Sequence, residues 1–275
     1  MTFSTFDNLI ANDIALLGMP FDAYSSHLKG PSEAPAIIRR TIFSGSSNPS
    51  TELGISLKNN PKLHDLGDLT WKNNDDAFSV LEQTIHHIAS LGAKPLTFGG
   101  DHSITYPILK SLAQHHSDIT ILHFDAHPDL YDSFQGNPFS HACPFARIME
   151  NKLAKRLVQI GIRTLNKHQA EQAERFNVEV HEMKDWTGPE QITFTGPVYV
   201  SIDLDALDPA FAPGVSHFEP GGLSVRQILD VLHSIQVPII GADIVEYNPR
   251  RDINEMTAMV ATKLYKEVCG KMLTI

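Results

Sequence analysis

The sequence of 275 residues has little cysteine, no long apolar segment and no run of basic residues. Its two cysteines, Cys143 and Cys269, match neither a C-x-x-C motif nor a disulfide framework, which favours a reducing compartment. There is no run of about 18 apolar residues, and the N-terminus lacks the basic and apolar regions of a secretory signal. We therefore expect a soluble, cytoplasmic protein with no membrane partner.

The charge is one-sided, with 22 Lys and Arg residues against 32 Asp and Glu residues and a net charge of −10. Because no basic patch is present, we expect no binding to nucleic acid or to an anionic membrane. The acidic excess favours a cationic substrate only weakly, since many soluble proteins are acidic for solubility alone. No stretch has the composition of a linker, so we predict one domain over residues 1–275.

Apolar β-type segments alternate with segments of helical periodicity along the chain. The expected strands are 13–18, 95–98, 119–125, 157–162, 178–181, 198–203 and 238–246. The expected helices are 31–40, 77–91, 106–116, 144–151, 167–176, 224–235 and 255–268. Strands that alternate with helices of this length predict an α/β domain with a mostly parallel sheet of seven or eight strands, covered on both faces.

Side chains with metal-ligating chemistry follow four of the expected strands. Within ITILHFDAHPD at 119–129, three of them are spaced i, i+2 and i+4, so they point to one side of an extended chain. Ligands of such sheets bind beyond the carboxyl ends of the strands. The residues at these ends are His102, Asp125, His127, Asp129, Asp203, Asp205 and Glu246.

The first six of these residues, two histidines and four aspartates, suit a pair of divalent ions. A single catalytic zinc typically takes three protein ligands and a water. Carboxylates favour Mg or Mn and imidazoles favour a transition metal, so Mn(II) is the best compromise, with Fe, Co, Ni or Zn as alternatives. Two such ions acidify a shared water, which implies attack by hydroxide on an electrophilic centre.

Other polar residues near these motifs have simpler explanations. A single D-x-H or D-x-D is more often a turn or a helix cap, but three such elements at successive strand ends make coincidence improbable. We expect His123 to serve internal packing or a backbone hydrogen bond, and Asp208 to shape the turn before Pro209. Asp101 is expected to orient a ligand or to cap the following helix.

Three motifs resemble the signatures of the ureohydrolase superfamily, which comprises arginase, agmatinase and their relatives. They are GGDHS at 99–103, FDAHPD at 124–129 and SIDLDALDPAFAPG at 201–214. The resemblance implies a single ureohydrolase domain with a three-layer α/β/α sandwich and a mostly parallel sheet of about eight strands. It also implies two Mn(2+) ions per subunit, hydrolysis of a small guanidino substrate to urea and an amine, and assembly into a trimer or hexamer.

The resemblance also implies roles for single residues. The metal ligands would be His102, Asp125, His127, Asp129, Asp203 and Asp205, with Asp129 contributing to catalysis as well. Glu246 would hold the guanidinium of the substrate, whose planar fork suits a carboxylate. His141 would pass a proton to the leaving amine, which suits the near-neutral pKa of a histidine.

The residues after FDAHPD leave the substrate open. Animal arginases have an asparagine there that helps to recognise the amino-acid end of arginine, whereas this chain has Leu130 and Tyr131. Agmatinases usually have APGTGTPE where this chain has APGVSHFEPGG, and PDLYDSFQGNPFSHACPF resembles the plant-type arginases. We therefore expect L-arginine as the substrate, with agmatine or another guanidino compound as the alternative.

Residues for the far end of the substrate are less well defined. The α-carboxylate of arginine needs a donor or a cation, and the candidates are Asn137, Ser140, Arg163 and His217. A two-metal phosphoesterase is less favoured, because the ligand loops have no adjacent basic residue for a phosphate. A non-catalytic relative would be expected to lose ligands, and all six are present.

Overall fold

The computed structural model describes residues 3–274, and its centre is an eight-stranded sheet in which all pairs of neighbouring strands are parallel. The strand order is β2-β1-β3-β8-β7-β4-β5-β6. The strands are β1 (Ile14–Gly18), β2 (Leu63–Asp68), β3 (Lys94–Phe98), β4 (Thr120–Phe124), β5 (Arg156–Ile162), β6 (Glu179–Glu182), β7 (Val198–Asp203) and β8 (Ile239–Val245).

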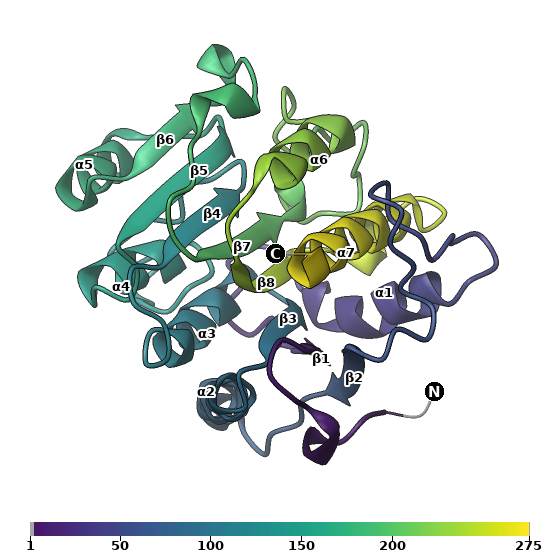
Figure 1. The fold of residues 1–275 in the computed structure, drawn as a ribbon. Coiled ribbons are helices and arrows are strands. Elements are labelled where there is room, and N and C mark those ends of the chain that lie inside the picture. Colours follow the sequence, from purple (N-terminus) through teal and green to yellow (C-terminus); the bar gives the residue numbers. More distant parts are fainter. Residues whose placement is uncertain (1–2, 275) are drawn as a thin grey trace.

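Helices cover both faces of this sheet (Figure 1). One face carries α2 (Asn74–Ser90), α3 (Thr105–Leu112), α4 (Pro144–Glu150) and α5 (Lys167–Phe176), and the other carries α1 (Ala34–Ile42), α6 (Val225–Ser234) and α7 (Met256–Thr274). Each layer encloses its own apolar core. The predicted α/β/α sandwich is therefore confirmed. Within residues 3–274, no helix has the length and apolar character needed to cross a membrane.

Local sequence signals explain several boundaries of these elements. Ser224 and Gln227 form the predicted capping box of α6: the Gln227 amide donates to Ser224 Oγ at 3.2 Å, and the Ser224 amide donates to Gln227 Oε1 at 2.8 Å. Pro31 opens a 3-10 turn that leads into α1, as expected of a proline in a first turn. The capping box and Pro31 therefore set where α6 and the turn before α1 begin.

The strand β2 is the one element of the sheet that sequence analysis missed. Its sequence LHDLGD is polar because β2 is an edge strand that pairs only with β1, and most of its side chains are partly exposed. Asp65 in β2 accepts from the Arg39 guanidinium at 3.0 Å, so the polar residue serves an ion pair with α1. Apolar alternation is therefore weak here although the strand is present.

The register of the central strands aligns polar residues in a row across the sheet. Gln159 of β5 lies opposite His123 of β4, His123 opposite Ser201 of β7, and Ser201 opposite Asp243 of β8. The strands are parallel, so their carboxyl ends meet at one edge of the sheet. Residues two positions further along a strand point to the same face. Side chains two positions further along these strands therefore lie next to the row, on the same face and nearer the carboxyl edge of the sheet.

Candidate metal centre and active site

The structure brings all six predicted metal ligands together at the carboxyl edge of the sheet. Three follow β4, two lie at the end of β7, and one begins the turn after β3. Five are buried and His127 is partly exposed. We refer to these six residues as the ligand cluster: His102, Asp125, His127, Asp129, Asp203 and Asp205.

The Nδ1 atom of His102 is the centre of one half of the cluster. Carboxylate oxygens of Asp125 and Asp129 lie 3.2 Å from it. An oxygen of Asp203 lies 3.1 Å from the same atom. This buried nitrogen forms no well-aligned hydrogen bond with any other residue in the described part of the chain. One ring nitrogen carries at most one proton, which cannot satisfy three carboxylates, whereas a divalent cation can.

His127 organises the other half of the cluster. Its Nδ1 atom lies 3.3 Å from Asp125 Oδ1 and 3.2 Å from Asp205 Oδ2. Asp125 therefore presents one oxygen to each of these two histidines and could contribute to holding both of two ions. The four aspartates carry four negative charges when ionised, and two divalent cations balance them. The donor set therefore fits a pair of divalent ions.

The pKa values show that, without a cation, the cluster disfavours four ionised aspartates side by side. Burial and the charge of Asp125 raise the pKa of Asp129 to about 7. Burial, together with the charges of Asp205 and Asp125, also raises the pKa of Asp203 well above its usual range. Burial lowers the pKa of His102, but the close carboxylates of Asp125, Asp129 and Asp203 outweigh it and raise the pKa well above its usual value, so the ring attracts a proton. The cluster favours an added cation.

Backbone groups hold the aspartates in place. The His127 amide donates to Asp125 Oδ1 at 2.6 Å, and the Asp205 amide donates to Asp203 Oδ1 at 2.8 Å. Asp129 has a φ of 50° and Glu246 a φ of 62°, a left-handed conformation that is uncommon outside glycine. Such backbone conformations persist where the surrounding structure enforces them, often at functional sites.

Ser201 and Asp243, which are neighbours in the polar row of the sheet, fix the orientation of the His102 ring. The Ser201 hydroxyl donates to Asp243 Oδ1 at 2.7 Å, and Asp243 Oδ2 accepts from Tyr199 at 2.6 Å and from Thr105 at 2.9 Å. Because its proton is used on Asp243, Ser201 Oγ accepts from His102 Nε2 at 2.9 Å. The lone pair of His102 Nδ1 is then directed at the aspartates, as a metal ligand requires.

His123 is buried, as the expectation of internal packing requires, but it also contacts the cluster. Its ring stacks on Phe145 with ring centroids 3.9 Å apart, and its Nε2 lies 2.9 Å from Asp125 Oδ2. Burial lowers the pKa of His123 to about 4, even though the hydrogen bond to Asp125 opposes this shift. The ring is therefore neutral.

A cavity of about 210 Å³ opens beside the ligand cluster. His141 and Glu246 form part of its inner wall together with the ligands. Tyr131, Phe134 and Glu219 also line it, and all three are partly exposed. We call these last three residues the mouth of the cavity.

Glu246 presents a free carboxylate oxygen at this cavity. Its Oε1 atom accepts from the His102 amide at 2.9 Å and contacts His141 Nδ1 at 2.8 Å. Its Oε2 atom is buried and has no hydrogen-bond partner within residues 3–274. An unpaired carboxylate oxygen is costly to bury, and a guanidinium in the cavity would supply the missing donor.

His141 is held from both sides. Its Nδ1 donates to Glu246, while its Nε2 accepts from the Ser26 amide at 3.1 Å and lies 2.8 Å from Ser26 Oγ. Burial lowers the pKa of His141, but the charge of Glu246 outweighs it and raises that pKa above its usual value. The Ser26 amide favours the neutral ring instead, because it donates to a lone pair on Nε2. Both ring nitrogens are therefore oriented.

Sequence analysis missed Ser26, which lies 115 positions before His141. The loop that carries it is tied to the GGDHS turn by Asp101, which accepts from the Tyr24 amide at 3.0 Å and from the Ser103 amide at 3.1 Å. Gly100 allows this approach, because a Cβ atom there would lie 1.7 Å from Phe21 O. No local motif indicated this contact.

The residues proposed for the far end of the substrate lie in different places. His217 lines the cavity, and its Nε2 is buried without a partner in the described chain. Asn137 and Ser140 do not line it, and their side chains accept from amides of their own loop. Arg163 is not available to a substrate, because its guanidinium donates to backbone carbonyls, among them that of Asp205 at 2.7 Å. The Arg163 hypothesis is therefore wrong.

Two structural expectations are clear in the hydrogen bonds. Asp208 accepts from the amides of Ala210 at 2.9 Å and Gly221 at 2.7 Å, so it holds the turn after β7. Asp101 caps the turn at Ser103. Neither residue lines the cavity.

Comparisons with known proteins agree with this geometry. A family model described as "Arginase family" matches residues 12–270. Arginase 2, chloroplastic/mitochondrial, from Arabidopsis thaliana is 46% identical over an alignment of 275 positions, gaps included. The alignment covers 94% of this chain and 80% of the relative. An agmatinase from Bacillus anthracis is 31% identical, and the alignment covers 94% of this chain and 91% of the relative. The structure of an arginase from Medicago truncatula superposes with a TM-score of 0.90 at 41% identity, with 96% and 88% covered.

Proposed function

Because the chain belongs to the arginase family, we propose that it hydrolyses L-arginine to L-ornithine and urea at a centre of two Mn(II) ions. The observation that carries the proposal is the unpaired Glu246 Oε2, which lies in a cavity that also contains the ligand cluster. A guanidinium bound to Glu246 would thus lie beside the ions.

The ligand cluster would hold the two ions, with Asp125 between His102 and His127. When bound, such ions supply hydroxide from water near neutral pH. Manganese is favoured because the donors are four carboxylates and two imidazoles, a mixture that suits neither pure oxygen-ligand metals nor zinc alone.

Glu246 and His141 would act on the substrate itself. Glu246 accepts N–H groups of the guanidinium and so orients the guanidinium carbon towards the ligand cluster. Glu246 favours the protonated His141 ring, which would donate from Nε2 to Ser26 Oγ and supply its Nδ1 proton, held 2.8 Å from the same carboxylate, to the leaving amine, so that the ring ends neutral. Ser26 helps to fix the orientation of the ring, because it contacts the opposite nitrogen.

The charge of the cavity supports a cationic substrate. Five carboxylates line it, those of Asp129, Asp203, Asp205, Glu219 and Glu246. No Lys or Arg side chain is among the described residues of its lining. A phosphoesterase would need cationic side chains for its anionic substrate, so this lining argues against that alternative.

Agmatine is the second candidate, because it carries the same guanidinium and lacks the α-carboxylate. The test is steady-state kinetics with urea detection on both substrates, using protein loaded with Mn(II). We expect a higher kcat/KM for arginine. A kcat/KM for agmatine far above that for arginine would reject the arginase assignment and favour agmatinase.

A further inference from the structure

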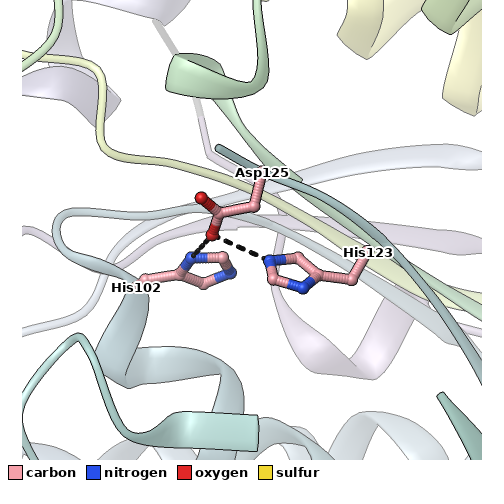
Figure 2. A group of neighbouring side chains, drawn as sticks. All are labelled: His102, His123 and Asp125. Atoms are coloured by element: carbon pink, nitrogen blue, oxygen red, sulfur yellow. Dashed lines mark hydrogen bonds and ion pairs between the residues drawn. The ribbon is translucent and has the colours of Figure 1, made fainter. Parts of the chain in front are cut away.

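His123 contacts the ligand cluster from the layer of side chains below it. Figure 2 shows His102 and His123 pointing at the same oxygen of Asp125 from two sides. The distances to this oxygen are 3.2 Å from His102 Nδ1 and 2.9 Å from His123 Nε2. These distances alone would permit His123 to be a third imidazole ligand. Whether His123 binds a metal ion or instead donates a hydrogen bond to Asp125 depends on which ring nitrogen carries the proton.

Gln159 fixes the position of that proton. Its Nε2 atom lies 2.7 Å from the carbonyl oxygen of Pro128, which can only accept, so the amide nitrogen and not the oxygen must face it. The same nitrogen lies 3.0 Å from His123 Nδ1, which therefore accepts. Because Nδ1 accepts, it carries no proton, so the N–H group of the ring is on Nε2 and donates to Asp125 Oδ2. A protonated ring nitrogen has no lone pair to offer a metal ion.

The surrounding elements hold this arrangement firmly. Gln159 and His123 are direct neighbours in the register of β5 and β4. The ring of His123 stacks on Phe145 of α4 with an interplanar angle of 29°. His123, Gln159 and Asp125 are all fully buried, so bulk water does not compete for these hydrogen bonds.

We propose that His123, held by Gln159, is a positioning residue for the metal centre. Its N–H group fixes the orientation of the Asp125 carboxylate, which faces both His102 and His127, and thereby sets the affinity for the ions. Partners of metal-ligating groups generally act in this way. The inference rests on the two-ion centre of the proposed function.

The test compares two amide substitutions at the same position. In His123→Gln, the chain from Cβ to Nε2 matches that of the histidine, so its amide can donate to Asp125. In His123→Asn the amide is one carbon shorter and cannot reach. Each protein is stripped with a chelator and titrated with MnCl2 by isothermal titration calorimetry. We expect the Kd for Mn(II) to rise about 10- to 100-fold in His123→Asn and to stay within a few-fold of the wild type in His123→Gln.

Gln159→Leu provides a second test in which the His123 ring and its stacking on Phe145 remain. Without the amide donor, the proton is no longer fixed on Nε2, so we expect a smaller but measurable loss of Mn(II) affinity. This result would support positioning even if His123→Asn did not fold.

Two outcomes would overturn the inference. Unchanged Mn(II) affinity in both His123→Asn and Gln159→Leu would show that the hydrogen bond to Asp125 has no role. An equal loss in His123→Gln and His123→Asn would indicate a direct ligand or a packing residue instead. Failure of the arginase assignment is distinguishable, since it would appear as wild-type protein that binds Mn(II) and releases no urea from arginine.

Discussion

The ligand cluster and the mouth of the cavity are held in opposite ways. In the cluster, carboxylates are buried and accept from backbone amides, as Asp125 and Asp203 do. At the mouth, Tyr131, Phe134 and Glu219 are partly exposed. The cluster follows strands whose register leaves its residues little freedom, whereas the mouth lies on loops. The chemistry is therefore fixed by the sheet, and substrate choice can change without disturbing it.

The largest effect should follow from a change in the cluster. In Asp125→Asn, the residue shared by both histidines loses its charge, and we expect kcat/KM for urea release to fall by about 10³-fold or more. The matched change at the mouth is Glu219→Gln, measured in the same assay. If Asp125→Asn kept more than a tenth of the activity, the contrast between the two regions would fail.

The next effect concerns proton transfer at the inner wall. In His141→Asn, the ring that carries the proton is lost while Glu246 and the ligand cluster remain, so we expect kcat to fall by about 10²- to 10³-fold. Mn(II) stoichiometry, measured by metal analysis after dialysis, should stay unchanged. A loss of bound metal in this variant would show that His141 supports the cluster and not the chemistry.

The pairing of Glu246 with His141 predicts a shift in pKa. In the metal-free protein, the negative charge of Glu246 raises the pKa of His141, and burial lowers it. Glu246→Gln removes the largest upward contribution, while the smaller ones of Asp101 and Asp129 remain against burial, so the pKa of His141 should fall and the ring should lose its proton at a lower pH. Histidine ring NMR signals followed against pH measure this directly. An unchanged or higher pKa in Glu246→Gln would contradict the pairing.

The smallest effect should be at the mouth. Glu219 is partly exposed, so solvent screens its charge, and we expect Glu219→Gln to change kcat/KM for arginine by less than about 10-fold. The ratio of arginine to agmatine turnover should change more than kcat does. A loss comparable to that of Asp125→Asn would place Glu219 within the catalytic machinery.

The same contrast explains what could be predicted from the sequence. The alternation of side chains along an extended chain predicts that Asp125, His127 and Asp129 point to one side, and the convergence of the carboxyl ends of parallel strands adds Asp203 and Asp205. The edge strand β2 was missed because its polar side chains mask the strand pattern. Ser26 was missed because its loop reaches His141 only through the tertiary contact at Gly100.

The polar row across the sheet, formed by Gln159, His123, Ser201 and Asp243, has a sequence pattern that could have been recognised. His123 and Ser201 each precede an aspartate ligand by two positions, within segments that otherwise have the pattern of buried strands. A polar side chain there points to the same face as the ligand and needs a partner. Gln159 and Asp243 are those partners, but only the strand order shows that they are neighbours. By contrast, loop residues such as Asn137 follow no periodic rule.

The central claim is that the six ligands hold two ions that urea release requires. The most direct measurement is a titration of chelator-stripped wild-type protein with MnCl2, in which bound metal and urea formed from arginine are measured in the same samples. We predict saturation at two ions per chain, no urea from the stripped protein, and recovery of activity as the ions bind. Saturation at one ion, or urea release that persists in the stripped protein, would contradict the two-ion mechanism.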